Sequence, residues 1–234
     1  MPESYRNESP LFWPIVRLKE AYLRGDLSPV EVLEEAILRA DEYNPSLNAY
    51  LERLDEQARL QARKAESFFM GPSKEIPSLC GIPISIKDTF ELKGSFTTYG
   101  SAFFRENLTK EDHDLVRRLR LSGAVFTGKT NTPEFAQSAT TENRLGDDAR
   151  NPWNTSYTPG GSSGGAAASV SAGLVTAAIG ADGGGSIRIP ASFTGLYGFK
   201  PTYGLCSYRK GLKAMSDFVA PGPLTRNVGD ARII

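Results

Sequence analysis

The chain has 234 residues, 40% of them hydrophobic, and carries 27 basic and 27 acidic side chains. A formal net charge of zero gives no sign of a nucleic-acid or anionic-membrane partner. One histidine and two cysteines are too few for a zinc site, and we expect both cysteines to be buried free thiols. Residues 1–6 carry no export signal, so we expect a soluble, cytoplasmic protein.

The first 75 residues predict a layer of helices in front of the rest of the fold. Ser28 and Glu31 have the spacing of a capping box, with Pro29 at the first helical position, and Asn44-Pro45 is expected to end that helix. The predicted elements are helices over 12–24, 28–44 and 55–69 and an extended segment over 47–54. We find no residues with catalytic character in this layer.

From Gly81 onward, predicted strands and helices alternate. The predicted strands cover 82–86, 124–127, 174–179 and 196–199, and the predicted helices cover 112–121, 165–172, 187–193 and 224–234. This alternation favours an α/β layered sheet, and the small-residue run 166–181 is too short to span a bilayer. We expect one domain over 1–234, with a front layer over 1–75 and a core over 76–234. The helical pattern reaches Ile234 without a stop signal, so we expect the front part of a longer protein.

Three features of the sequence that can signal function have ordinary structural interpretations here. Gly123 to Thr130 fits the nucleotide P-loop pattern, but a helix precedes it and its Ala-Val-Phe interior predicts a strand, so we expect a helix–turn–strand junction. Residues 117–120 are basic and predict a solvated helix face. His113 lies among acidic residues and is expected at the surface, which leaves a serine nucleophile in need of a different base.

Two clusters of glycine and serine, at 160–165 and 183–186, point to chemistry. Backbone N–H groups beside glycines can approach a developing oxyanion because no side chain blocks them. The second cluster lies between a predicted buried strand and a predicted helix, so Ser186 occupies a nucleophile-elbow type of position. Lys87, at the end of a predicted strand, is the candidate base.

These blocks closely resemble the signature of the amidase signature family. The residues that carry the resemblance are 81–88, 128–135, 151–154, 160–165, 180–191, 195–202 and 222–226. The resemblance implies a mixed β-sheet layered between α-helices, of which this chain would hold the N-terminal part. It also implies a Ser–cis-Ser–Lys triad and no metal or cofactor. Such a triad works only if its lysine is neutral, so we expect Lys87 to be desolvated and to touch Ser162.

The resemblance assigns a role to each of eight residues. Ser186 would be the nucleophile, Ser162 the bridging serine that follows a cis peptide, and Lys87 the base. Gly183, Gly184 and Gly185, together with Ser186, would supply oxyanion-hole amides, and Ser163 and Arg188 would support the site.

The implied function is hydrolysis of a small-molecule carboxylic acid amide to an acid plus ammonia or amine, through a serine acyl-enzyme. One alternative is the glutaminase subunit of a tRNA-dependent amidotransferase, although Ile189 stands where that branch often has a polar residue. Another is a truncated, non-catalytic fragment. We expect no nucleic-acid or membrane partner, and a homodimer stays open.

Overall fold

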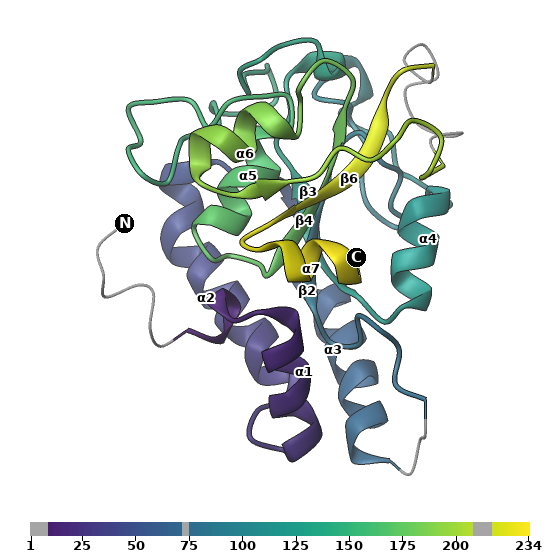
Figure 1. Ribbon diagram of the computed structural model, residues 1–234. Helices are drawn as coiled ribbons and strands as arrows, with labels where there is room; N and C mark the ends of the chain where they lie inside the picture. Colours follow the sequence, from purple (N-terminus) through teal and green to yellow (C-terminus); the bar gives the residue numbers. More distant parts are fainter. Residues whose placement is uncertain (1–8, 72–74, 208–216) are drawn as a thin grey trace.

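A computed structural model describes residues 9–71, 75–207 and 217–234 of the chain. Its core is a six-stranded mixed sheet with helices packed against both faces, which confirms the expected α/β architecture (Figure 1). Residues 1–6, which the export-signal prediction concerned, lie outside the described residues. Among the described helices, none combines the length and the apolar character that crossing a membrane requires.

The front of the chain forms the predicted helical layer, at the lower end of the view in Figure 1. Its elements are η2 (Pro10–Phe12), α1 (Ile15–Arg24), α2 (Pro29–Leu47), β1 (Tyr50–Arg53) and α3 (Asp55–Met70). The capping box of α2 is confirmed, since Ser28 Oγ accepts from the Glu31 amide at 3.1 Å and the Glu31 carboxylate accepts from the Ser28 amide at 2.7 Å. The whole-chain domain assignment stays a prediction.

The remaining elements build the sheet and its second helical layer. They are β2 (Pro83–Lys87), η3 (Ala102–Phe104), α4 (Asp114–Leu121), β3 (Val125–Thr130), η4 (Glu134–Ala136), α5 (Gly164–Ser171), β4 (Ala177–Asp182), α6 (Arg188–Thr194), β5 (Tyr197–Gly198), β6 (Ala220–Thr225) and α7 (Val228–Ile233). The strand order is β1-β3-β2-β4-β6-β5, and the central strand β2 runs parallel to both β3 and β4. The carboxyl ends of three adjacent strands therefore meet at one edge of the sheet.

The two faces of the sheet enter different cores, because side chains alternate along a strand. Ala177 and Ile179 of β4 join a large cluster that includes residues of α1, α2 and α4. Ala178 joins a second cluster, built by α5 and α6. In β2, Ser85 bonds to Ser169 of α5 at 2.9 Å, so the odd-numbered side chains of this strand face α5.

Helix α5 lies unusually close to its neighbours because it consists of small residues. All eight of its residues are buried. A Cβ atom added at Gly165 would stand 2.4 Å from the Asn131 amide nitrogen and 2.5 Å from the Ala49 carbonyl oxygen. These are backbone atoms that cannot rotate away, so the approach of α5 to the loop after β3 requires glycine at this position.

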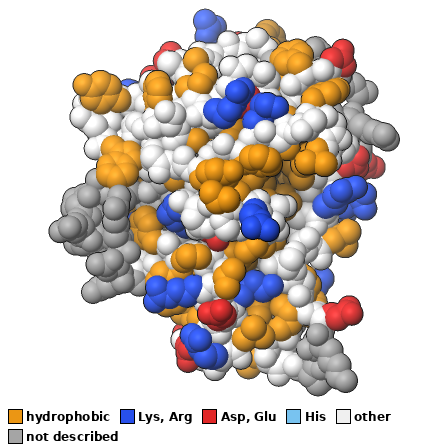
Figure 2. Space-filling view, viewed as in Figure 1, with side chains coloured by type: hydrophobic (Ala, Val, Ile, Leu, Met, Phe, Trp, Pro, Cys, Tyr) orange, Lys and Arg blue, Asp and Glu red, His pale blue; other side chains and the backbone are white. Residues whose placement is uncertain are grey.

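Cover by helices is less complete near the β5–β6 edge of the sheet. Figure 2 shows hydrophobic side chains gathered on the face that carries β6 and α7 in Figure 1. Phe199, just after β5, and Val228, in α7, are both exposed. The parallel centre of the sheet is thus enclosed, whereas this edge carries apolar side chains at the surface.

The expected end of α2 at Asn44-Pro45 is wrong. The helix continues through Pro45 to Leu47 and ends at Asn48, which adopts the left-handed conformation at φ 48°. Leu47 is buried in a cluster with residues of α5, and Asn44 accepts hydrogen bonds from the amides of Ala49 and Tyr50 through its side chain. Tertiary packing of the last turn therefore outweighs the helix-ending tendency of Asn-Pro.

Two strands differ from the expected pattern. Strand β4 covers 177–182 rather than 174–179, and the predicted helix from Leu224 begins instead as β6, with α7 following only at Val228. Pro221 and Pro223 made β6 hard to recognise, because proline cannot donate to a ladder. Both prolines pair with β4, while β5 meets β6 only at Leu224 and Thr225.

The crowding at Gly165 yields a stability prediction. Gly165→Ala should lower the free energy of unfolding by about 1–3 kcal/mol, since the added methyl group meets fixed backbone atoms. Gly146→Ala is the matched control, because nothing lies within 4 Å of the Cβ position there. Urea unfolding of the two variants measures the difference, and equal stabilities would contradict the close packing of α5.

Candidate active site

Lys87 is a buried lysine at the carboxyl end of the central strand β2. Its side chain is fully buried, and its Nζ lies 2.6 Å from Ser162 Oγ. Burial lowers the pKa of Lys87 to about 7, and the negative charge of Asp182 opposes this shift in part. The expected burial of Lys87 and its contact with Ser162 are both present, so a neutral amine is available near neutral pH.

Ser162 lies in the glycine-rich segment that leads into α5. The peptide bond between Gly161 and Ser162 is cis, as the family resemblance implied. Ser162 itself is fully buried. The next residue, Ser163, donates its amide to the Ser186 carbonyl oxygen at 3.1 Å, and its Oγ lies 3.4 Å from both the carbonyl oxygen and the amide nitrogen of Ala181. Ser163 thus joins the start of α5 to the second glycine turn.

Ser186 follows the glycine turn that leaves β4, directly before α6. It opens onto a cavity of about 300 Å³ that Lys87 and Ser162 also line. Gly183 and Gly184 line the same cavity. One strand end and two glycine-rich segments thereby bring the predicted nucleophile, bridging serine and base to one concave site.

Asp182, which the sequence did not single out, organises this turn. Its carboxylate is fully buried and accepts from the amides of Gly185 at 2.8 Å and Ile187 at 3.1 Å. Arg188 donates to it through Nε at 2.9 Å and Nη2 at 2.8 Å, and the supporting role of Arg188 in catalysis stays a prediction. Burial raises the pKa of Asp182, but the bonds from Arg188 and the amides outweigh burial and hold that pKa below its usual value.

The residues of the glycine turn differ in whether their backbone amide donates to Asp182. The Gly185 N–H donates to the carboxylate, whereas the residues Gly183, Gly184 and Ser186 line the cavity and donate no amide to Asp182 in the described structure. A signal for Asp182 existed in the sequence, since an acidic residue that ends a strand before a glycine turn is placed to accept turn amides.

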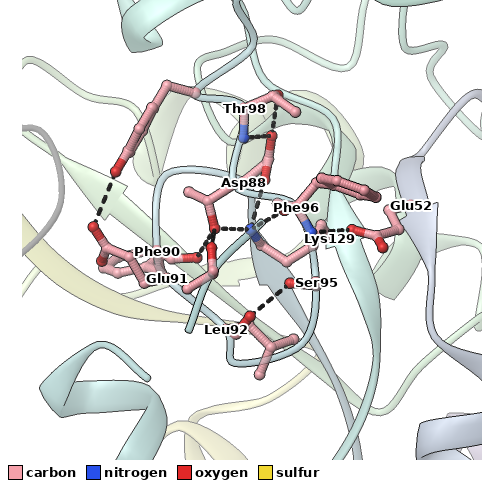
Figure 3. Close-up of polar contacts among 12 residues, drawn as sticks. Glu52, Asp88, Phe90, Glu91, Leu92, Ser95, Phe96, Thr98 and Lys129 are labelled. Atoms are coloured by element: carbon pink, nitrogen blue, oxygen red, sulfur yellow. Dashed lines mark hydrogen bonds and ion pairs between the residues drawn. The ribbon is translucent and has the colours of Figure 1, made fainter. Parts of the chain in front are cut away.

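A second buried lysine, Lys129, lies on the neighbouring strand β3. Lys129 Nζ contacts Asp88 Oδ1 at 2.6 Å, and it also donates to the Phe96 carbonyl oxygen at 3.0 Å and to Thr97 Oγ1 at 2.9 Å. The other oxygen of Asp88 accepts from the amide and the hydroxyl of Thr98 (Figure 3). Both charged side chains are almost completely buried. The ion pair fastens the loop after β2 to β3.

Lys129 belongs to the segment whose sequence matches the P-loop pattern. Residues 125–130 form strand β3, and Gly123 sits in the turn between α4 and that strand at φ 83°. The lysine that would touch a phosphate is instead enclosed with Asp88. The predicted helix–turn–strand junction is confirmed.

The surface position predicted for His113 is wrong. His113 is fully buried, and its Nδ1 accepts from the Leu115 amide at 3.2 Å, where it caps α4. Its ring packs edge-on against Phe90 with centroids 5.1 Å apart. Its acidic neighbours suggested exposure, but the side chain turns inward to a capping role. Cys80 is buried as expected, whereas Cys206 is only partly buried, and both are free thiols.

Comparison with known proteins supplies the family context. The model of the family named Amidase matches residues 31–234. A glutamyl-tRNA(Gln) amidotransferase subunit of Protochlamydia amoebophila is 39% identical over 220 residues, which are 94% of this chain and 45% of that protein.

Solved structures give the same result. A bacterial aryl acylamidase of the amidase signature family superposes with a TM-score of 0.88 at 32% identity, over 94% of this chain and 46% of that one. The peptide amidase of Stenotrophomonas maltophilia superposes with a TM-score of 0.85 at 32% identity, over 93% of this chain and 46% of that one. The chain spans about half the length of the curated relatives it matches.

The Lys129–Asp88 pair yields a stability prediction. Lys129→Met leaves a buried, uncompensated carboxylate and should lower the free energy of unfolding by about 3–5 kcal/mol. The double variant Lys129→Met/Asp88→Asn should recover part of that loss. Arg24→Met, which breaks a surface pair with Asp26, serves as the control and should change stability little. A single variant as stable as the wild type in urea would contradict the buried pairing.

Burial of Lys87 yields a prediction about pH. Between pH 7 and 10.5 the unfolded chain holds a proton that the folded chain has released, so wild-type stability rises with pH in that window. Lys87→Met removes this group, and the variant should be more stable than the wild type below pH 7. Above pH 7, the difference in the free energy of unfolding between the variant and the wild type should shrink by up to about 1.4 kcal/mol per pH unit. A pH-independent difference in urea unfolding would show that Lys87 is not desolvated.

Proposed function

The chain belongs to the amidase family, and from that membership we propose that it hydrolyses carboxylic acid amides through an acyl-enzyme on Ser186. The observation that carries this function is the 2.6 Å contact between the Nζ of a fully buried Lys87 and Ser162 Oγ, at a cavity that Ser186 shares. A desolvated lysine joined to a serine is a base that needs no histidine.

Acylation follows from these positions. Ser186 Oγ attacks the amide carbon, its proton passes to Ser162, and Ser162 gives its own proton to neutral Lys87. The carbon–oxygen bond forms as the carbonyl electrons move to oxygen. When the tetrahedral intermediate collapses, the carbon–nitrogen bond breaks and the leaving nitrogen takes a proton back through Ser162. Water then releases the acid by the same proton path in reverse.

The glycine turn would stabilise the oxyanion. We assign this role to the amides of Gly183, Gly184 and Ser186, which line the cavity. Gly185, the third predicted donor, would have to release Asp182 to take part. Each such donor is worth about 10²–10³ in rate in other serine hydrolases.

The apolar residues of the cavity wall indicate which acyl group the substrate would carry. Ile189, Phe218 and Val219 are among the residues that line the cavity, so the acyl group would be apolar, and an amide with an alkyl or aryl acyl group fits best. A solved relative is named as an aryl acylamidase, and similar chemistry here is part of this proposal. A location in the cytoplasm and a homodimer also stay predictions.

A second candidate is the glutamine-hydrolysing subunit of a tRNA-dependent amidotransferase. Several curated relatives are named as a subunit of glutamyl-tRNA(Gln) amidotransferase, at identities of 37–42%. The apolar Ile189 in the cavity wall argues for a simple amide over glutamine. Ammonia released from glutamine only when partner subunits are added would favour this second function. Equal inactivity of this chain on every amide, with activity in a longer chain, would favour a non-catalytic fragment.

The nucleophile assignment has a direct test. Ser186→Ala should abolish hydrolysis of an aryl amide and labelling by a fluorophosphonate, because the attacking oxygen is gone. Ser171→Ala is the matched control, since Ser171 is a buried serine bonded to the Thr194 carbonyl oxygen, and it should retain both signals. Mass spectrometry of labelled peptides locates the adduct. An adduct on another residue, with hydrolysis intact in Ser186→Ala, would reject the assignment.

A further inference from the structure

Thr89 carries a buried hydroxyl whose hydrogen-bonding partner is missing from the described part of the protein. The residue is 1% exposed, and its Oγ1 makes no hydrogen bond within residues 9–71, 75–207 and 217–234. An unsatisfied buried hydroxyl is destabilising, because it has lost its hydrogen bonds to water without a replacement. Each such group therefore needs an explanation, and a bound ligand is one.

Its position separates Thr89 from the other buried threonines. Thr130, Thr132 and Thr176 also carry hydroxyls without a partner in the described residues. Thr89 lines the cavity that holds Lys87, Ser162 and Ser186, whereas those three threonines do not. A molecule in the catalytic cavity can therefore satisfy the hydroxyl of Thr89 and not theirs.

The backbone around Thr89 is held rigidly. Lys87 and Phe90 close a tight turn, in which the Phe90 amide donates to the Lys87 carbonyl oxygen at 3.1 Å, and Thr89 is its third residue. The preceding residue, Asp88, is directed away to Lys129 and Thr98, as Figure 3 shows. The buried ion pair thus helps to fix the turn whose third residue, Thr89, lines the cavity, so the backbone at Thr89 is in place before a ligand arrives.

The place of Thr89 in the cavity indicates which part of a substrate it meets. In the proposed mechanism the leaving nitrogen must face Ser162 and Lys87, because it takes its proton from them. The carbonyl oxygen faces the glycine turn at Gly183 and Gly184. Thr89 belongs to the same tight turn as Lys87 and not to the glycine turn, so we assign it to the nitrogen side of the substrate.

We propose that Thr89 is a substrate-binding residue whose hydroxyl accepts a hydrogen bond from the N–H of the scissile amide. This inference rests on the proposed function and deepens it. It makes the site selective for primary and secondary carboxamides over tertiary amides and over esters, which offer no N–H at that place.

The test compares an amide with an ester of the same acyl and aryl groups, p-nitroacetanilide and p-nitrophenyl acetate. Thr89→Val keeps the shape of the side chain and removes the hydroxyl. It should lower kcat/KM for the amide about two- to tenfold, the loss expected for one uncharged hydrogen bond, and leave the ester within about twofold. Thr89→Ser should stay close to wild type on both compounds. Thr176→Val, which removes an equally buried hydroxyl outside the cavity, should change neither rate.

A second measurement needs no turnover. In the Ser186→Ala protein with ¹³C-labelled methyl groups, added acetanilide should shift the methyl resonances of Thr89 and Ile189 and leave that of Thr176 in place. A shift of the Ile189 methyl resonance without a shift of the Thr89 resonance would overturn the role of Thr89. Equal losses of kcat/KM on the amide and the ester in Thr89→Val would do the same, and both results would leave the proposed function standing. No shift of either methyl would contradict the proposed function as well.

Discussion

The proposed chemistry depends on keeping one lysine side chain out of water. Lys87 ends the central strand of the sheet, and its amine meets Ser162 rather than solvent. Desolvation disfavours the ammonium form and brings the pKa to about 7, at a cost to stability that a shorter or apolar residue would avoid. The parallel arrangement of β2, β3 and β4 makes this burial practicable, since helices cover both faces of those strands.

Two buried carboxylates maintain the surroundings of that lysine in different ways. Asp182 gathers the amides of the turn that carries Ser186, and Arg188 partly balances its charge. Asp88 pairs with Lys129 and fastens the loop that begins next to Lys87. Both carboxylates accept several hydrogen bonds, which is the condition under which buried charges persist in proteins. The candidate site is therefore positioned by ionic contacts that take no part in the proposed reaction.

Much of the fold and the site could be predicted from the sequence, because the decisive signals are local. The capping box of α2, the small residues of α5 and the glycine clusters each act over a few residues. The features that were missed depend on distant contacts: β6 is a strand because β4 pairs with it despite two prolines, and α2 passes Pro45 because Leu47 packs against α5. His113 and Asp182 were missed for another reason, since their partners Leu115 and Gly185 lie only two and three residues away and the local pattern was open to this interpretation.

The central claim is that Lys87 is a neutral amine at the pH at which the protein works. NMR titration of the protein with ¹³C-labelled lysine Cε, in which Lys87→Met identifies the resonance, measures its ionisation directly. We predict a midpoint near pH 7, far below that of the exposed lysines. A midpoint near 10.4, the value of a solvated lysine, would contradict the account, because Lys87 would then be charged and unable to accept a proton.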